Sequence, residues 1–127
     1  IDLSLAPNRE ILADAFRFWE NQKLNNWAWC IMSNHIHWVF SLNKHDERNN
    51  PVYLQDILQS VKRTTARKIN EHYGLIGKSL WQKESYDTTI RDHVHLHRAI
   101  EYTLNNPVKA GLVKNQCEWV GSWQRIG

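Results

Sequence analysis

The segment that decides the fold reads WCIMSNHIHWVF and runs from Trp29 to Phe40. Apolar and aromatic residues fill both ends of it, and a short polar turn at Ser33–Asn34 interrupts them. This pattern predicts two strands, Trp27–Met32 and His35–Leu42, which pair in antiparallel fashion. Side chains alternate between the two faces of a strand, so residues two apart point the same way. His35 and His37 should therefore lie side by side on one face, with Ile36 turned into the core.

Two imidazoles at this spacing form a candidate metal site. Neutral imidazole is a common ligand of divalent ions, and two preset rings need only one further donor. The alternative is a pair of histidines on a solvated strand face, and the segment by itself leaves both interpretations open.

Length and composition limit the class of protein. The chain has 127 residues, which predicts one domain, 1–127, with a substantial hydrophobic core. Its formal net charge of +3 permits a nucleic-acid partner without requiring one. Cys30 and Cys117 form no metal or redox motif, which favours a reducing cytoplasm. No apolar run approaches the roughly 20 residues of a membrane span, so we expect no membrane partner.

Three helices follow from apolar spacing and from capping residues, and they are expected over residues 8–23, 54–73 and 92–106. Asn8 is a suitable N-cap for the first helix, and Gly74 is a suitable C-cap for the second. The third helix should stop at Asn106, because Pro107 disfavours helical geometry in the residue before it.

The order of the elements predicts an antiparallel α+β fold of the ferredoxin-like type, with helices packed on the sheet. Asn43–Pro51 should be a loop, and Leu80–Ile90 a strand or extended segment. The tail with Trp119 and Trp123 is expected to form short irregular pieces. A ferredoxin-like sheet normally begins with a strand, and Ile1–Leu5 is at best a stub of one, so we expect that residues are missing before Ile1.

The third helix carries polar side chains on one face. Tyr102 and Asn106 are four residues apart and are therefore neighbours, and His95 and Arg98 fall on the same face. This face offers a phenol, an amide oxygen, an imidazole and a guanidinium. The alternative is a solvated helix face whose tyrosine packs at the edge of the core.

A second run of alternating histidines, at positions 93, 95 and 97, lies at the start of the same helix. On a helix these imidazoles are spread at intervals of about 200°, so they cannot chelate one ion together.

Four blocks of the chain resemble, in the right order, segments of the HUH transposases that use a single tyrosine. MSNHIH at 32–37 is similar to "MPNHVH", and YTLNNPVKAGLV at 102–113 is similar to "YIHxNPVxAGLV". Between them, LQSVKRTTARK at 58–68 and the segment 80–92 resemble "LQSFKRxTxRK" and "WQxxFxDxxIRD". The likeness covers most of the chain from Asn8 onward, and it is closest to the repeat-palindrome-associated tyrosine transposases. Its departures, such as Ser33 in place of proline, leave the reacting positions untouched.

The resemblance implies an HUH-endonuclease fold and a metal-dependent enzyme that cleaves and rejoins single-stranded DNA with hairpin or palindromic ends in transposition. Tyr102 would be the nucleophile and would form a 5′-phosphotyrosine intermediate. His35, His37 and Asn106 would hold Mg²⁺ or Mn²⁺. A bacterial, nucleoid-associated enzyme of the cytoplasm is expected, and a monomer and a homodimer both fit.

The second helix is the best-marked candidate for DNA contact. Lysine and arginine there can neutralise phosphates, and amides can reach base edges. The candidates on this helix are Gln59, Lys62, Arg63, Arg67 and Asn70. Further candidates are Lys83, Arg91, His95 and Arg98, of which Arg98 is also expected to help Tyr102 to ionise. The alternative for the second helix is an ordinary charged solvent face.

Two other functions stay open. One is a domesticated relative that binds hairpin DNA but no longer supports transposition. The other is a small metallohydrolase that uses His35 and His37 with a metal-bound water, although the chain has no HExxH-like cluster. Substitution of Tyr102 by phenylalanine separates the transferase from the hydrolase.

Overall fold

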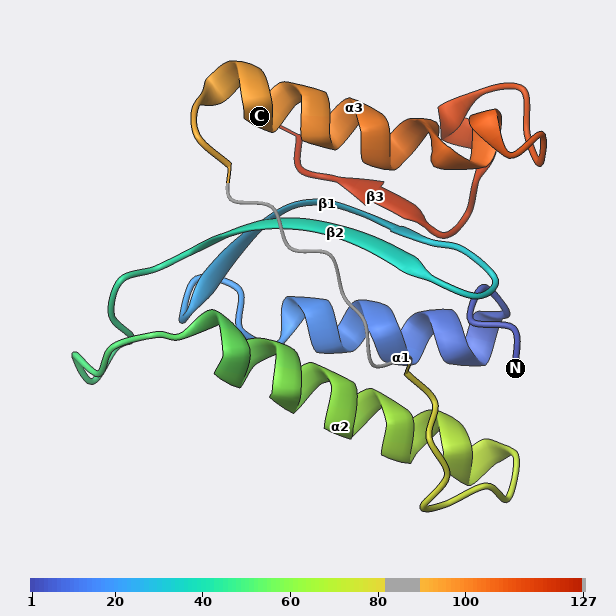
Figure 1. Ribbon diagram of the computed structural model, residues 1–127, viewed down its shortest axis with the longest axis horizontal. Coiled ribbons are helices and arrows are strands. Elements are labelled where there is room, and N and C mark those ends of the chain that lie inside the picture. Colours follow the sequence, from blue (N-terminus) through green and yellow to red (C-terminus); the bar gives the residue numbers. More distant parts are fainter. Residues whose placement is uncertain (82–89, 127) are drawn as a thin grey trace. The chain divides into compact units, whose positions relative to one another are not determined.

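The computed structural model describes residues 1–81 and 90–126. Figure 1 shows their helices and strands, coloured along the sequence. Their contacts group into two compact units. Among the described residues, the first unit comprises 1–5, 26–41 and 90–126, and the second comprises 6–25 and 42–81. Each unit is therefore assembled from separate stretches of the chain. The single domain expected from the length stays a prediction.

The first unit contains most of a three-stranded sheet. Its strands are β1 (Leu24–Ile31), β2 (Ile36–Leu42) and β3 (Ser122–Gln124), in the order β2-β1-β3. The turn between β1 and β2 is closed by the Met32 N–H, which donates to the His35 carbonyl over 2.9 Å. The predicted hairpin is confirmed. Its first strand begins three residues before Trp27, where the buried Leu24 extends the apolar run.

β3 corrects our prediction that the tail is irregular. It pairs antiparallel with β1 and places Trp123 opposite Trp29, and the two indole rings stack with their centroids 4.4 Å apart. The Trp119 indole N–H also donates to the Ile31 carbonyl over 3.0 Å. A strand of three residues is too short to show alternation in the sequence, and a distant partner strand stabilises it. The strand expected over Leu80–Ile90 lies almost wholly outside the described residues and stays a prediction.

The helix of the first unit is α3 (His93–Lys109), which contacts β3 (Figure 1). Asp92 is its N-cap, because the carboxylate accepts the backbone N–H of His95 over 2.8 Å. A short 3-10 turn, η1 (Gln116–Glu118), follows the helix and also contacts it.

The predicted stop of this helix at Asn106 is wrong, since Pro107 lies inside α3. Proline removes one backbone donor, and in the last turn this costs a single helical hydrogen bond, while the Pro107 ring is buried. The helix ends instead at Lys109, with Ala110 as its C-cap, and Gly111 follows the cap with a φ of +76°. The N–H groups of Gly111 and Leu112 donate to the carbonyls of Val108 and Pro107 over 3.0 and 2.9 Å, which is a Schellman ending.

In the second unit, α1 (Ala6–Arg17) packs against α2 (Leu54–His72). The prediction that Asn8 caps α1 is wrong, because the helix begins two residues earlier, with Pro7 in its first turn. Asn8 is buried and donates through Nδ2 to the Tyr73 hydroxyl over 2.9 Å. The helix also ends before Lys23, in turns where Asn21 has a φ of +67°.

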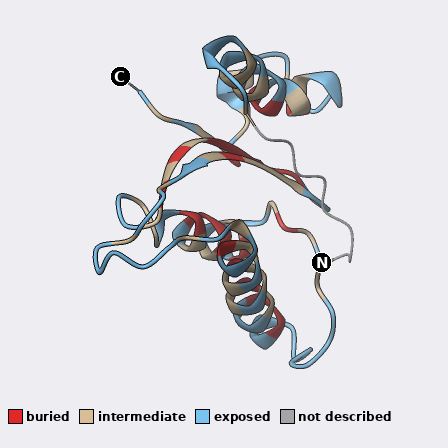
Figure 2. Ribbon diagram, turned by 60° about the vertical axis from the view of Figure 1, so that its left-hand side comes forward, coloured by how far each residue is buried: buried red, intermediate tan, exposed pale blue. Residues whose placement is uncertain are grey.

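α2 has the predicted extent, and Gly74 follows its C-cap with a φ of +67°. Its buried residues include Ile57, Val61, Thr65 and Ile69, which recur every four positions. Figure 2 shows buried and exposed residues interleaved along this helix, as expected of an amphipathic element. The predicted loop over Asn43–Pro51 holds no helix or named strand. None of the helices in the described ranges is long and apolar enough to cross a lipid bilayer.

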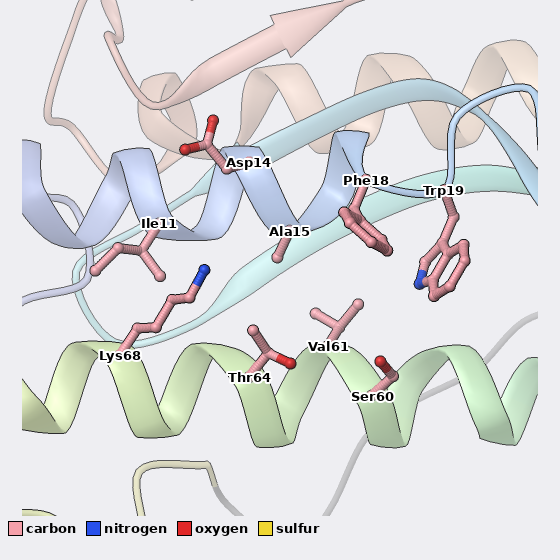
Figure 3. Close-up of a pocket in the computed structure, with 9 residues that line it drawn as sticks. All are labelled: Ile11, Asp14, Ala15, Phe18, Trp19, Ser60, Val61, Thr64 and Lys68. Carbon is pink, nitrogen blue, oxygen red and sulfur yellow. The ribbon is translucent and has the colours of Figure 1, made fainter.

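A pocket of about 190 Å³ lies between α1 and α2, within the second unit (Figure 3). Ile11, Ala15 and Val61 give it apolar walls, and Phe18, which is 64% exposed, lies at its edge. The remaining lining residues are Asp14, Trp19, Ser60, Thr64 and Lys68. The two helices therefore leave part of their shared apolar surface uncovered.

Candidate active site

The two histidines lie at the start of β2. His35 is the last residue of the turn, and His37 is the second residue of the strand. Their ring centroids are 5.1 Å apart and their planes are nearly perpendicular, at 87°. The structure therefore brings the two imidazoles together, as the strand spacing predicts. His35 is exposed, while His37 is half-buried.

Asn34 orients His35, the exposed or outer histidine of the pair. The Oδ1 atom of Asn34 lies 2.7 Å from Nδ1 of His35. An amide oxygen only accepts, so Nδ1 carries the hydrogen in this arrangement and Nε2 presents its lone pair. Metal-binding histidines are commonly held in this way by a partner on the other ring nitrogen. Our sequence analysis missed this role of Asn34, because contact between adjacent residues leaves no periodic signal.

His37 is kept in its neutral form. Burial lowers the pKa of His37, the neighbouring His35 lowers it further, and a hydrogen bond with the Asn106 side chain opposes both effects. The net pKa lies below the ordinary histidine value, so at neutral pH the ring has no charge. This is the form in which imidazole binds metals.

α3 places Tyr102 and Asn106 against His37, the half-buried or inner histidine. The rings of Tyr102 and His37 meet edge to face, with centroids 5.6 Å apart and an interplanar angle of 88°. The Nδ2 atom of Asn106 donates to the backbone carbonyl of Tyr102 over 2.8 Å, which leaves its Oδ1 for the bond with His37. Tyr102 is 59% exposed, so a substrate can reach it. The strand spacing and the helix spacing thus bring together four side chains, which are those of His35, His37, Tyr102 and Asn106.

These donors fit a divalent ion. Within the described part of the chain, no group of three or more His, Cys, Asp or Glu side chains is placed to share an ion. A site at the histidine pair would therefore take its third donor from the amide oxygen of Asn106. Two imidazole nitrogens and one amide oxygen suit Mn²⁺ or Mg²⁺ and leave positions open for phosphate oxygens or water. The metal-binding role of these residues remains a prediction.

In the described part of the chain, neither Arg98 nor His95 forms a hydrogen bond or a cation–π contact with Tyr102. Arg98 is exposed one turn earlier on α3, and no bond from it to Tyr102 occurs within residues 1–81 and 90–126. His95 turns back toward the start of the helix, where its Nδ1 accepts the Arg91 N–H over 3.2 Å. The cation that does approach is Lys109, whose Nζ lies 5.9 Å from the centroid of the Tyr102 ring. Sequence analysis missed Lys109 because the helix was expected to stop before it. The DNA-binding roles of Arg91, His95 and Arg98 remain predictions.

On α2, three of the predicted DNA contacts share one exposed face. Gln59, Arg63 and Arg67 are exposed and recur every four residues, while Lys62 is half-buried. The prediction for Asn70 is wrong, since its side chain is buried and donates to the Lys78 carbonyl over 2.8 Å. Lys83 lies outside the described residues.

Comparison with known proteins gives two matches in sequence. The chain is 27% identical over 92 residues to the REP-associated tyrosine transposase of Escherichia coli (strain K12). It is 28% identical over 95 residues to a putative REP-associated tyrosine transposase of Haemophilus influenzae. Each match covers 72% of this chain but only 49% and 54% of those proteins, so the chain spans about half the length of the curated relatives it matches. No model of a known protein family matches the chain.

A solved structure gives the fold. The chain is similar to a REP-associated tyrosine transposase bound to a REP hairpin, with a TM-score of 0.67 and 22% identity. The match covers 93% of this chain and 66% of that one. It confirms the predicted α+β fold class. The chain is therefore related in sequence to the REP-associated tyrosine transposases and has their fold, as the four sequence blocks indicate.

Proposed function

We propose that this protein is a metal-dependent endonuclease and strand transferase that acts on single-stranded DNA beside a hairpin, with Tyr102 as its nucleophile. The observation that carries the proposal is the edge-to-face contact of Tyr102 with His37, one helical turn from Asn106. The names of the sequence relatives favour a transposase, and the REP hairpin bound to the structural relative favours hairpin DNA as the partner.

In the proposed reaction, the Tyr102 oxygen attacks phosphorus in line and loses its proton to solvent. The new bond joins the tyrosine oxygen to phosphorus, while the bond to the 3′-oxygen breaks. The 3′-oxygen leaves with the electron pair and takes a proton from water. The products are a 5′-phosphotyrosine and a 3′-hydroxyl, and the covalent link conserves the energy needed for rejoining. A divalent ion, when bound, would polarise the phosphate and neutralise developing charge.

The side chains around Tyr102 would prepare this step. Asn34 would hold His35 with Nε2 turned outward as a ligand. His37 would bind in the neutral form that burial favours. Asn106 bridges the tyrosine backbone and the His37 ring, and would thereby keep the nucleophile beside the ligands. The exposed guanidinium groups of Arg63 and Arg67 would neutralise backbone phosphates of the DNA.

Covalent capture tests the proposal. The protein is mixed with labelled single strands taken from the flanks of its own gene, each with a hairpin and an unpaired extension, and with Mn²⁺ or Mg²⁺. We expect a protein–DNA adduct on a denaturing gel, which EDTA, Tyr102→Phe and His35→Ala each abolish. Tyr53→Phe is a matched control, because Tyr53 is 62% exposed and lies on the other unit.

Two results would contradict the proposal, and each would favour a different function. Binding without an adduct across the whole panel would favour a domesticated hairpin-binding protein. Cleavage that survives Tyr102→Phe would favour a metallohydrolase that uses a metal-bound water.

A further inference from the structure

We infer that Lys109 is a phosphate-binding residue of the Tyr102 site, whose ammonium group contacts the phosphate that Tyr102 attacks. The inference rests on the proposed function of Tyr102 as the nucleophile.

The geometry places Lys109 beside the nucleophile. Its Nζ lies 5.9 Å from the centroid of the Tyr102 ring, within the range of a cation–π contact. Lys109 follows Tyr102 by seven residues, which is about two helical turns, so the two side chains share one face of α3. The helix continues through Pro107 to Lys109, and this extension brings Lys109 onto that face.

Both partners are open to a ligand. Tyr102 is 59% exposed and Lys109 is exposed. Within the described ranges, no carboxylate forms an ion pair with Lys109. The nearest acidic residue along the helix, Glu101, accepts instead from Gln116 Nε2 over 3.4 Å. The ammonium group can therefore meet a phosphate without first breaking a salt bridge.

Negative charge builds up on the attacked phosphate during the proposed reaction, and a cation beside Tyr102 would stabilise it. The attacked phosphodiester carries one negative charge, and the attacking phenolate brings a second into the transition state. The phosphotyrosine product remains an anion beside the same ring. An ammonium group next to the tyrosine can donate a charge-assisted hydrogen bond to a non-bridging oxygen throughout. Lys109 stays protonated and forms no covalent bond.

A purely structural role is the rival explanation. Lysine in the last turn of a helix also interacts favourably with the helix dipole. That role predicts a change in thermal stability alone, whereas phosphate binding predicts changes in salt dependence and in adduct formation.

The test compares Lys109→Ala, Lys109→Arg and Lys114→Ala, the last being an exposed lysine beyond the helix end. Two quantities are measured on the hairpin oligonucleotides: the rate of adduct formation, and the slope of log affinity against log salt in a Tyr102→Phe background. We expect Lys109→Ala to slow adduct formation roughly tenfold or more. Its salt slope should fall by about one unit. Lys109→Arg should restore much of both, and Lys114→Ala should match the parent protein.

The inference is overturned if Lys109→Ala leaves both quantities unchanged, or if Lys114→Ala changes them equally. Its failure is distinct from failure of the proposed function, which shows as no adduct with the unaltered protein. In that case the salt slope alone decides whether Lys109 binds phosphate.

Discussion

His35 and His37 are equivalent in the sequence pattern, but their surroundings differ. His35 is exposed, and its orientation depends on one hydrogen bond that its ring donates to the Asn34 side-chain oxygen. His37 is half-buried between His35, Tyr102 and Asn106, and its lowered pKa keeps it neutral. The inner ring is thus held by packing, while the outer ring relies on a neighbouring side chain.

Substitution of Asn34 tests this difference. Asn34→Ala removes the acceptor on His35 Nδ1, so the ring can rotate or change tautomer. We expect the affinity for Mn²⁺, measured by titration calorimetry, to fall about 10- to 100-fold. Ser33→Ala, at the adjacent exposed turn position, should bind as the parent protein does. Equal affinities for Asn34→Ala and the parent would show that Asn34 does not position the ligand.

The residues of the site that follow a strand or helix period could be predicted from the sequence. The period of a strand pairs His35 with His37, and the period of a helix pairs Tyr102 with Asn106. Asn34 and Lys109 could not be found in this way. The first depends on side-chain rotamers, and the second on a helix that continues past a proline.

Among the elements, α3 matters most, because it carries the proposed nucleophile. Asp92 accepts the His95 N–H at its first turn and so satisfies a donor that the helix itself leaves open. We expect Asp92→Ala to lower the free energy of unfolding by about 1 kcal/mol, as measured by urea denaturation. Asp92→Asn keeps an acceptor and should stay near the parent value. An equal loss in both variants would mean that the cap bond does not stabilise the helix.

The exposed face of α2 carries the prediction on DNA contact. Arg63→Ala and Arg67→Ala should each weaken binding of the hairpin oligonucleotide and lower its salt slope by about one unit. Arg48→Ala, an exposed arginine in the loop before α2, is the matched control and should bind as before. Fluorescence anisotropy at several salt concentrations measures these values. Unchanged slopes for both α2 variants would identify this face as an ordinary charged surface.

Element boundaries were less predictable than element types. The hairpin and α2 follow from long apolar patterns, and both are confirmed. β3 was missed because three residues show no period, and its stability comes from pairing with β1 far away in the sequence. The ends of α1 and α3 differ from the sequence prediction because burial, which the sequence does not show, decides the roles of Asn8 and Pro107. Asn8 is buried in the core, and Pro107 is accommodated in the last turn of α3.

Across the whole molecule, two compact units are built from stretches that alternate along the chain. β1 has its first two residues in the second unit and the rest in the first. The sequence predicts one domain of 127 residues, and a small single domain unfolds in one cooperative transition, so the two units should unfold together.

A core substitution in the second unit tests this coupling. Phe16 is fully buried in α1, so Phe16→Ala should destabilise the protein by about 3–5 kcal/mol. We expect the circular dichroism signal of the Trp29–Trp123 stack, in the first unit, to melt at the same lowered temperature as the helices. Phe18→Ala, at a side chain that is 64% exposed, should have a small effect. Separate transitions would contradict the single-domain prediction.

The position of the covalent bond to DNA shows directly whether Tyr102 is the nucleophile. The protein is incubated with the hairpin oligonucleotide and Mn²⁺, treated with nuclease and protease, and its peptides are weighed by mass spectrometry. We expect one modified peptide, which carries a 5′-phosphonucleotide on Tyr102. Cleaved DNA with no modified peptide, or a nucleotide attached to a different residue, would contradict it.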